Sequence, residues 1–224
     1  TGSFNNDSGF SIVSYTGTGS AGTIKHGLSS KPAVMIHKNL SAADAWTVYH
    51  HKNTSAPETD HLYLNLTQAT EDGSTQYNDT APTSSVFSVG SSTETNESGS
   101  GIIAYCFAEK QGYSKFGSYT GNGNANGTFV YLGFKPAWVM IKKTSGTGNW
   151  CLFDNKRGVN GAMIQLNPDN TNADNTSDYI DFLLNGFKCR NTASDKNASG
   201  GSYIYMAFAS NPFVTSTGVP ATAR

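Results

Sequence analysis

The sequence is poor in charged residues, which make up 14% of its 224 positions, and its formal net charge is −1. An ordinary globular domain carries about 25% charged residues. Lys142-Lys143 and Lys156-Arg157 are the longest basic groups. Because a protein holds a nucleic-acid backbone with clustered cations, this composition argues against a nucleic-acid partner. Abundant Ser, Thr, Asn and Gly hydrate the surface instead, which is more typical of extracellular binding modules and virus fibres than of cytosolic enzymes.

Long apolar runs and paired cysteine motifs are also missing. No run approaches the ~20 apolar residues that cross a bilayer, so we expect no membrane insertion. The three cysteines, Cys106, Cys151 and Cys189, show no C-x-x-C spacing, which excludes the usual cysteine zinc motifs. We expect them to be small buried residues. Because the sequence begins at Thr1 rather than Met, we also expect a processed product or a piece of a longer protein.

The sequence repeats itself after roughly 100 residues, the size of a small domain. The motifs that return are Ser14-Tyr15-Thr16-Gly17 as Ser118-Tyr119-Thr120-Gly121, Lys31-Pro32-Ala33 as Lys135-Pro136-Ala137, Trp46 as Trp150, and Phe107-Ala108 as Phe208-Ala209. We therefore predict two domains, 1–108 and 109–210, followed by an extended tail, 211–224. Residues present in both copies should serve the shared fold, whereas residues present in one copy are better candidates for a specific activity.

Short segments rich in Val, Ile, Tyr and Phe, separated by Gly, Asn, Ser and Pro, predict strands throughout. The predicted strands are 9–16, 32–38, 46–51, 61–66, 85–90 and 101–108 in the first copy, and 113–120, 127–131, 136–143, 149–154, 162–166, 179–190 and 202–209 in the second. Residues 177–185 are also compatible with a short helix ended by Gly186. The fold class is all-β, with two tandem antiparallel β-sandwiches of the jelly-roll or lectin-like kind.

Three segments carry a resemblance to a known family. They are residues 112–143, 150–158 and 200–224, the last ending in GVPATAR. They resemble a repeated module of unknown function found in tail-fibre and other virion structural proteins of marine bacteriophages. The resemblance implies a virion component, placed on the virion or outside the cell, with itself or other virion proteins as partners. It implies no catalytic residues.

Aromatic and amide side chains in loops are candidates for binding sugars, because a sugar lays its apolar C–H face on a ring while amides and carboxylates bind its hydroxyls. The candidates are Tyr77, Asn78 and Asp79 in the long loop 67–85, Tyr119, Asn122 and Asn124 at the equivalent end of the second copy, and Trp138. Core packing is the alternative for the aromatic residues.

Two sets of side chains could hold a metal. Asp169, Asp174 and Asp178 supply oxygen ligands in a flexible loop, as calcium requires, although an EF-hand would place Gly and Glu where Asp174 and Ile180 stand. His37 and His50, on neighbouring predicted strands, could form a zinc site with His61. The alternatives are Asn/Asp turns that satisfy their own backbone and histidines at strand ends. No other cofactor is expected.

Three functions remain open. The first is a non-enzymatic phage fibre or tail module that adheres to glycans on the host surface as a homo-oligomer. The second is a purely architectural capsid-decoration or filament subunit, assembled through strand edges or terminal strands. The third is a polysaccharide depolymerase with paired carboxylates. No Gly-x-Ser-x-Gly nucleophile motif occurs, and the scarcity of charged residues fits a binding module, which needs no perturbed ionisable groups.

Overall fold

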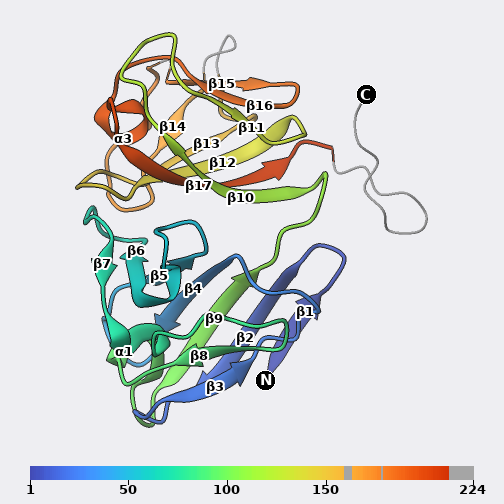
Figure 1. Cartoon of the computed structure of the whole chain (residues 1–224), viewed down its shortest axis with the longest axis vertical. Coiled ribbons are helices and arrows are strands. Elements are labelled where there is room, and N and C mark those ends of the chain that lie inside the picture. Colours follow the sequence, from blue (N-terminus) through green and yellow to red (C-terminus); the bar gives the residue numbers. More distant parts are fainter. Residues whose placement is uncertain (159–162, 178, 212–224) are drawn as a thin grey trace. The chain divides into compact units, whose positions relative to one another are not determined.

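The structure, a computed structural model, describes residues 1–158, 163–177 and 179–211. The chain divides into two compact units, Thr1–Glu109 and Lys110–Arg224 (Figure 1). Strands dominate both units and pair antiparallel, so the all-β prediction is confirmed. None of the helices in the described part has the length or apolar composition needed to span a bilayer. Except for Asn211, the predicted tail 211–224 lies outside the described residues.

Unit 1 contains a seven-stranded sheet and a two-stranded sheet. In spatial order the large sheet runs β1 (Gly2–Asn5), β2 (Phe10–Thr16), β9 (Gly101–Phe107), β4 (Val34–Asn39), β5 (Thr47–His50), β6 (Asp60–Tyr63) and β7 (Glu71–Asp72). The small sheet pairs β3 (Gly22–Lys25) with β8 (Val86–Val89). Three short helical turns are η1 (Pro57–Thr59), α1 (Ser74–Tyr77) and α2 (Thr93–Asn96). Met35, Tyr49 and Ala104 of the large sheet pack with Phe87 of the small one in a buried core.

Unit 2 contains a five-stranded sheet and a three-stranded sheet. The first runs β10 (Ser114–Thr120), β17 (Ser202–Ala209), β12 (Pro136–Lys143), β13 (Cys151–Asp154) and β14 (Gln165–Leu166). The second runs β11 (Phe129–Tyr131), β16 (Gly186–Cys189) and β15 (Ile180–Leu183), and α3 (Ser194–Asn197) precedes β17. Side chains of both sheets, such as Val139, Phe153 and Phe187, pack together in one core. They stand at alternate positions of their strands, as the two-residue period of a strand requires.

The strand order in the two units matches over most of their length. The order β2-β9-β4-β5-β6 in unit 1 corresponds to β10-β17-β12-β13-β14 in unit 2, and the pair β3–β8 corresponds to β11–β16. Among the described strands, β1 and β7 of unit 1 and β15 of unit 2 have no counterpart. The repeated sequence motifs therefore occupy the same places in both sheets.

The repeated tyrosine joins each sheet to a short helix. The hydroxyl of Tyr15 donates to the carbonyl oxygen of Thr95 in α2 at 2.5 Å, and Tyr119 donates to the carbonyl of Lys196 in α3 at 2.6 Å. These carbonyls belong to four-residue helices, which cannot satisfy them internally. The tyrosine therefore supplies a hydrogen bond that the short helix needs.

The repeated glycine that follows allows the chain to pass close to the same helix. A Cβ atom on Gly17 would lie 2.1 Å from the carbonyl oxygen of Glu97, and one on Gly121 would lie 2.3 Å from that of Ala198. Both atoms belong to backbone, which cannot yield as a flexible side chain can. The motif Ser-Tyr-Thr-Gly thus recurs because its tyrosine and glycine make one contact in both units.

Residues 177–185 contain β15 rather than a helix, because Ile180 and Phe182 alternate with Asp181 and pack into the core. The short helices α1, α2 and α3 were not predicted, since four residues are too few to display a helical period. The three cysteines are free and buried as expected.

We expect Gly17→Ala to lower the free energy of unfolding by about 1–3 kcal/mol, because the new methyl group overlaps a backbone carbonyl. Gly101 lies on β9 and pairs with Thr16, the residue before Gly17. A methyl group added there would meet no atom within 4 Å, so Gly101→Ala should change the free energy of unfolding by less than about 0.5 kcal/mol. Urea denaturation of the full chain measures both. Equal effects of the two substitutions would contradict this account of the close approach.

Candidate functional site

The predicted sugar-binding loop of unit 1 does not present an aromatic ring. Tyr77 is only 1% exposed, and its ring centroid lies 5.7 Å from that of His37 and 5.5 Å from that of Tyr49. The expectation for Tyr77 is therefore wrong, because α1 turns the ring into the core. Asn78 and Asp79 are exposed, and their φ angles of 52° and 45° end the helix. Without the tyrosine ring, these two residues offer only polar groups.

The residues predicted to bind sugars in unit 2 stabilise the conformation of their own loop. The ring of half-buried Tyr119 stacks on Tyr203 with centroids 5.0 Å apart. Asn122 Oδ1 accepts from the backbone N–H of Asn124 at 3.0 Å and from Asn197 Nδ2 at 3.0 Å. Both loop asparagines are exposed, yet these amide groups are occupied by the protein itself. The structure therefore gives Tyr119, Asn122 and Asn124 a role in the fold.

Trp138 lies on β12, opposite Asp154 on one side and Phe208 on the other. It is half-buried, and its ring centroid is 5.5 Å from that of Phe208. Its neighbour Val139 points into the core of unit 2, so Trp138 occupies the opposite face of the sheet. The structure does not bring it together with Tyr119 or the asparagine loop.

The acidic loop of unit 2 is tied to the protein at two points. Asp169 Oδ2 accepts from the backbone N–H of Trp150 at 3.1 Å, and Asp174 forms an ion pair with Arg157 at 3.3 Å. Asp178 lies outside the described residues. Within the part of the chain that is described, no three His, Cys, Asp or Glu side chains group as metal ligands would. In unit 1 an amide, Asn65, accepts from Trp46 in the equivalent way.

The zinc prediction is wrong because two of its three histidines point to opposite faces of the sheet. His37 pairs with Thr47, and His50 pairs with Val34. Since successive side chains alternate between faces, residues 37 and 47 lie on the core face, whereas residues 34 and 50 lie on the other. His61 alone shares the core face with His37.

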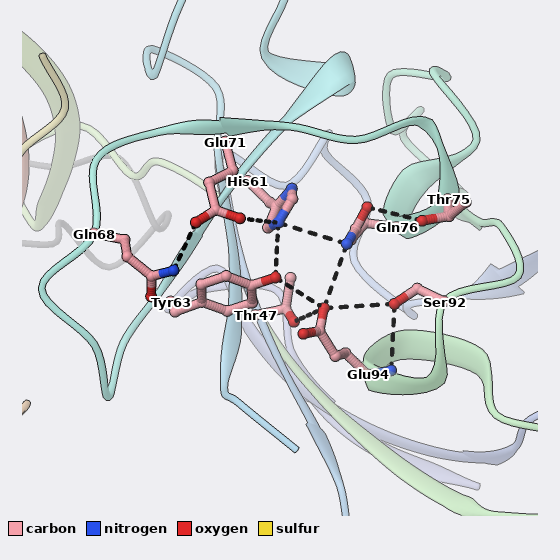
Figure 2. A network of polar contacts seen from close by, with 9 residues as sticks. All are labelled: Thr47, His61, Tyr63, Gln68, Glu71, Thr75, Gln76, Ser92 and Glu94. Carbon is pink, nitrogen blue, oxygen red and sulfur yellow. Dashed lines mark hydrogen bonds and ion pairs between the residues drawn. The ribbon is translucent and has the colours of Figure 1, made fainter.

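His61, on β6, belongs to a polar network (Figure 2). It is 3% exposed, and its Nε2 lies 2.9 Å from the hydroxyl of Tyr63, 3.5 Å from Gln76 Nε2 and 3.8 Å from Glu71 Oε2. Burial lowers the pKa of His61, and the nearby carboxylates, Glu94 first, oppose that shift. The neutral imidazole is therefore favoured at pH 7.

Glu94, in α2, is the acceptor at the centre of the same network (Figure 2). Its Oε2 accepts hydrogen bonds of 3.3–3.4 Å from Thr47, Tyr63, Gln76 and Ser92. These donors come from β5, β6, α1 and the residue that caps α2. In Figure 2 they converge on one carboxylate oxygen, so the network joins two short helices to the sheet.

Unit 2 fills the equivalent place differently. Gln165, on β14, accepts a hydrogen bond from Lys196 Nζ at 2.7 Å, and that ammonium lies 4.0 Å from the ring centroid of Tyr179. Lys196 is 2% exposed. Its Nζ also lies 3.7 Å from Cys151 Sγ, but burial raises the pKa of that thiol to about 12. Since the thiolate is the reactive form of cysteine, Cys151 is not poised as a nucleophile at neutral pH.

Sequence reasoning missed an exposed aromatic face on the three-stranded sheet of unit 2. Phe129 and Tyr131 on β11 are 43% and 59% exposed, and Leu183 on β15 is 36% exposed. Cross-strand pairing places Tyr131 beside Gly186 and Gly186 beside Leu183. Gly186 is obligatory, since a Cβ there would lie 2.0 Å from the carbonyl oxygen of Val130. Phe129 Cε2 would lie 3.1 Å from the same Cβ, so the Phe129 ring, like its neighbour Tyr131, lies next to a residue without a side chain.

Charged groups lie on the same face. Phe129 pairs with Lys188, which in turn pairs with Asp181, and Asp181 Oδ2 accepts from Arg190 Nε at 2.9 Å. At the rim, Lys115 Nζ donates to the carbonyl of Tyr131 at 2.9 Å and lies 5.3 Å from its ring centroid. We call the following set the β11–β16–β15 platform: Lys115, Phe129, Tyr131, Asp181, Leu183, Gly186, Lys188 and Arg190 (strands in Figure 1).

The corresponding strands of unit 1 carry no such aromatic pair. Aligning the inward pair Ile24–Phe87 with Val130–Phe187 places Thr23 at the position of Phe129 and Lys25 at that of Tyr131. Alternation of Phe129-Val130-Tyr131 was visible in the sequence, but which face pointed outward was not. The aromatic pair of the platform is therefore present in one copy only.

A family model described as "Domain of unknown function (DUF7483)" matches residues 1–212. The match covers more than half of the chain, so the chain belongs to this family. No curated protein and no solved structure matches it.

The burial of His37 predicts a loss of stability in acid. Burial lowers the pKa of His37 to about 3, below the ~6.5 of an unfolded histidine. As pH falls below 6.5, the unfolded state binds the proton first, so stability present at pH 7 is lost progressively down to about pH 3. Between pH 7 and 4 this histidine should cost about 3 kcal/mol.

His37→Phe, which keeps a ring against Phe87, should remove that component. We expect the variant to lose less stability than the parent between pH 7 and 4 in urea denaturation. Met35→Leu, which alters the same core without removing a titratable group, should retain the parent's dependence. An unchanged pH profile for His37→Phe would show that His37 does not titrate as described.

Proposed function

We propose that this member of the DUF7483 family is a non-enzymatic adhesion module of a phage virion appendage. In this proposal the β11–β16–β15 platform binds a glycan on the host surface. The observation that carries the proposal is the pair of rings, Phe129 and Tyr131, held 43% and 59% exposed next to Gly186, which has no side chain to cover them. Phage origin is supported by the sequence resemblance in residues 112–143, which include both rings.

The chemistry of the platform suits a saccharide. A pyranose has apolar C–H faces that can cover an aromatic ring, and removing that apolar area from water drives the contact. Its hydroxyls need polar partners at the edge of the ring, and Asp181, Lys188 and Arg190 supply both acceptors and donors. Binding sites commonly combine an apolar surface with a few oriented polar groups in this way.

The placement of the rings on a sheet also favours binding. Strand pairing fixes the backbone of β11, β16 and β15, and Lys115 bonds to the backbone of Tyr131. Less conformational entropy is then lost when a ligand binds, which is the advantage of a preorganised site. A site of this size is weak alone, and copies joined in an oligomeric appendage gain affinity through effective concentration.

We further propose that each unit is a β-sandwich repeat of the jelly-roll or lectin-like kind. The shared order of five strands in the large sheets supports a duplication. The core of unit 2, built from side chains of both of its sheets, supports the sandwich. In this proposal unit 1 has the same kind of fold but lacks the exposed aromatic face.

One observation favours an architectural subunit as a second candidate. β1 is an edge strand of unit 1, all four of its residues are exposed, and Phe4 is 60% exposed. An exposed edge can pair with a strand from another molecule. In that case strand pairing between copies would be the function, and the platform would not be needed.

Tyr131→Ala and Phe129→Ala should each weaken binding to host cells or to glycans on an array by about tenfold. Covering about half of an aromatic ring contributes on the order of 1.4 kcal/mol, which corresponds to that factor. Leu40→Ala is the control, because Leu40 is 62% exposed but belongs to unit 1. Undiminished binding by both aromatic variants would rule out the platform, and loss of assembly on deleting residues 1–5 would support the architectural candidate.

A further inference from the structure

We propose that the β11–β16–β15 platform selects acidic glycans, meaning saccharides whose sugar rings carry a carboxylate. The inference rests on the proposed function, since it names the class of glycan bound at the same face. It is carried by the charges that surround the two exposed rings.

The platform is cationic in a chain that is not. Lys115, Lys188 and Arg190 bring three positive charges to it, and Asp181 is its one carboxylate, whereas the whole chain has a formal net charge of −1. Asp181 accepts from Arg190 at 2.9 Å, so that carboxylate offsets one of the three cations. The remaining positive charge favours an anionic ligand, and at an exposed face the attraction is screened by salt.

Lys188 is placed where its ammonium group could contact the carboxylate of a bound sugar. Strand pairing sets it directly between Phe129 and Asp181 on one face of the sheet. Side chains on directly paired strand residues are about 5 Å apart, close to the width of one sugar ring. A ring lying on Phe129 therefore brings a substituent within reach of the ammonium group of Lys188.

Asp181 separates this ligand class from a nucleic acid. Aromatic rings with nearby cations also suit single-stranded nucleic acid, whose bases stack and whose phosphates need a basic track. Here Asp181 stands between Lys188 and Arg190 and interrupts the row of cations that successive phosphates would need, whereas a saccharide with a single carboxylate needs only Lys188. The Asp181 carboxylate accepts hydrogen bonds from sugar hydroxyls, and a charged acceptor makes those bonds stronger than neutral ones.

Lys115 has a different role from Lys188. Its Nζ donates to the carbonyl of Tyr131 and lies 5.3 Å from the ring centroid, within the ~6 Å of a cation–π contact. It thus positions the ring as well as adding charge. Replacing Lys115 would disturb both properties, so Lys188 gives the cleaner test of charge recognition.

The test compares two forms of one polymer, a polyuronate and the same polymer with its carboxylates reduced to alcohols. The full chain should bind the acidic form more tightly at low salt, and added salt should narrow the difference. Lys188→Gln should weaken binding to the acidic form about two- to fivefold, as expected for an exposed charge contact. Its binding to the reduced form should stay unchanged.

Two control variants sharpen the result. Lys188→Arg keeps the charge and should restore most of the preference for the acidic polymer. Lys156→Gln removes an exposed lysine from the turn after β13, away from the three-stranded sheet, and should change neither affinity. Thermal unfolding of each variant confirms that the fold is retained, since the substituted side chains are not in the core.

The possible outcomes separate this inference from the proposed function. Equal binding of both polymers, lost in Tyr131→Ala but unaffected by Lys188→Gln, would overturn acid selection and leave glycan binding standing. Binding that survives in Tyr131→Ala would overturn both. Tighter binding of a single-stranded oligonucleotide, weakened by Tyr131→Ala and Lys188→Gln alike, would assign the platform to nucleic acid instead.

Discussion

The contact between a strand end and a four-residue helix underlies both units. In each, a tyrosine hydroxyl bonds to a helix carbonyl, and the glycine two residues after that tyrosine lies against a carbonyl just beyond the helix. An asparagine completes the junction, as Asn197 does by accepting from the backbone of Asn122. These bonds satisfy groups that such short helices leave unpaired. Once the strand ends are held, the surrounding loops can change without loss of the sheets.

The two units differ at two places outside this junction. In the first, His61 and Glu94 build one buried polar network in unit 1, while Gln165 and Lys196 build another in unit 2. Most of these polar atoms have hydrogen-bond partners, as buried polar groups need if they are not to cost stability, but Nδ1 of His61 has none among the described residues. In the second, β11 carries two outward rings and β15 lies beside β16, whereas the corresponding pair β3–β8 has no aromatic pair on that face and no third strand within the described part of the chain. Both places reach solvent, since the Glu71 side chain of the unit 1 network is 40% exposed and the rings of the platform are 43% and 59% exposed.

The sequence predicted the strands of the sheets but not the β11–β16–β15 platform. Strand periodicity located β9 at Gly101–Phe107 and β17 at Ser202–Ala209 almost to the residue, because long alternating runs show which side chains face a core. Tyr77 was misplaced because α1 has four residues, too few for a helical pattern. The platform was missed because the outward direction of Phe129 and Tyr131 depends on pairing with β16, a contact between segments distant in sequence.

Because the chain carries few charges, the cations of the platform stand out from the rest of its surface. A surface hydrated by hydroxyl and amide groups exerts little long-range attraction on any ligand, so a few cations grouped around two rings can decide what binds. Electrostatic contacts at an exposed face contribute specificity more than affinity, and in the proposed function the rings would supply the affinity. A strongly basic protein would attract every anionic polymer through its overall field. In a chain of net charge −1, the proposed recognition of an acidic sugar would depend on the local arrangement of Lys188 beside Phe129.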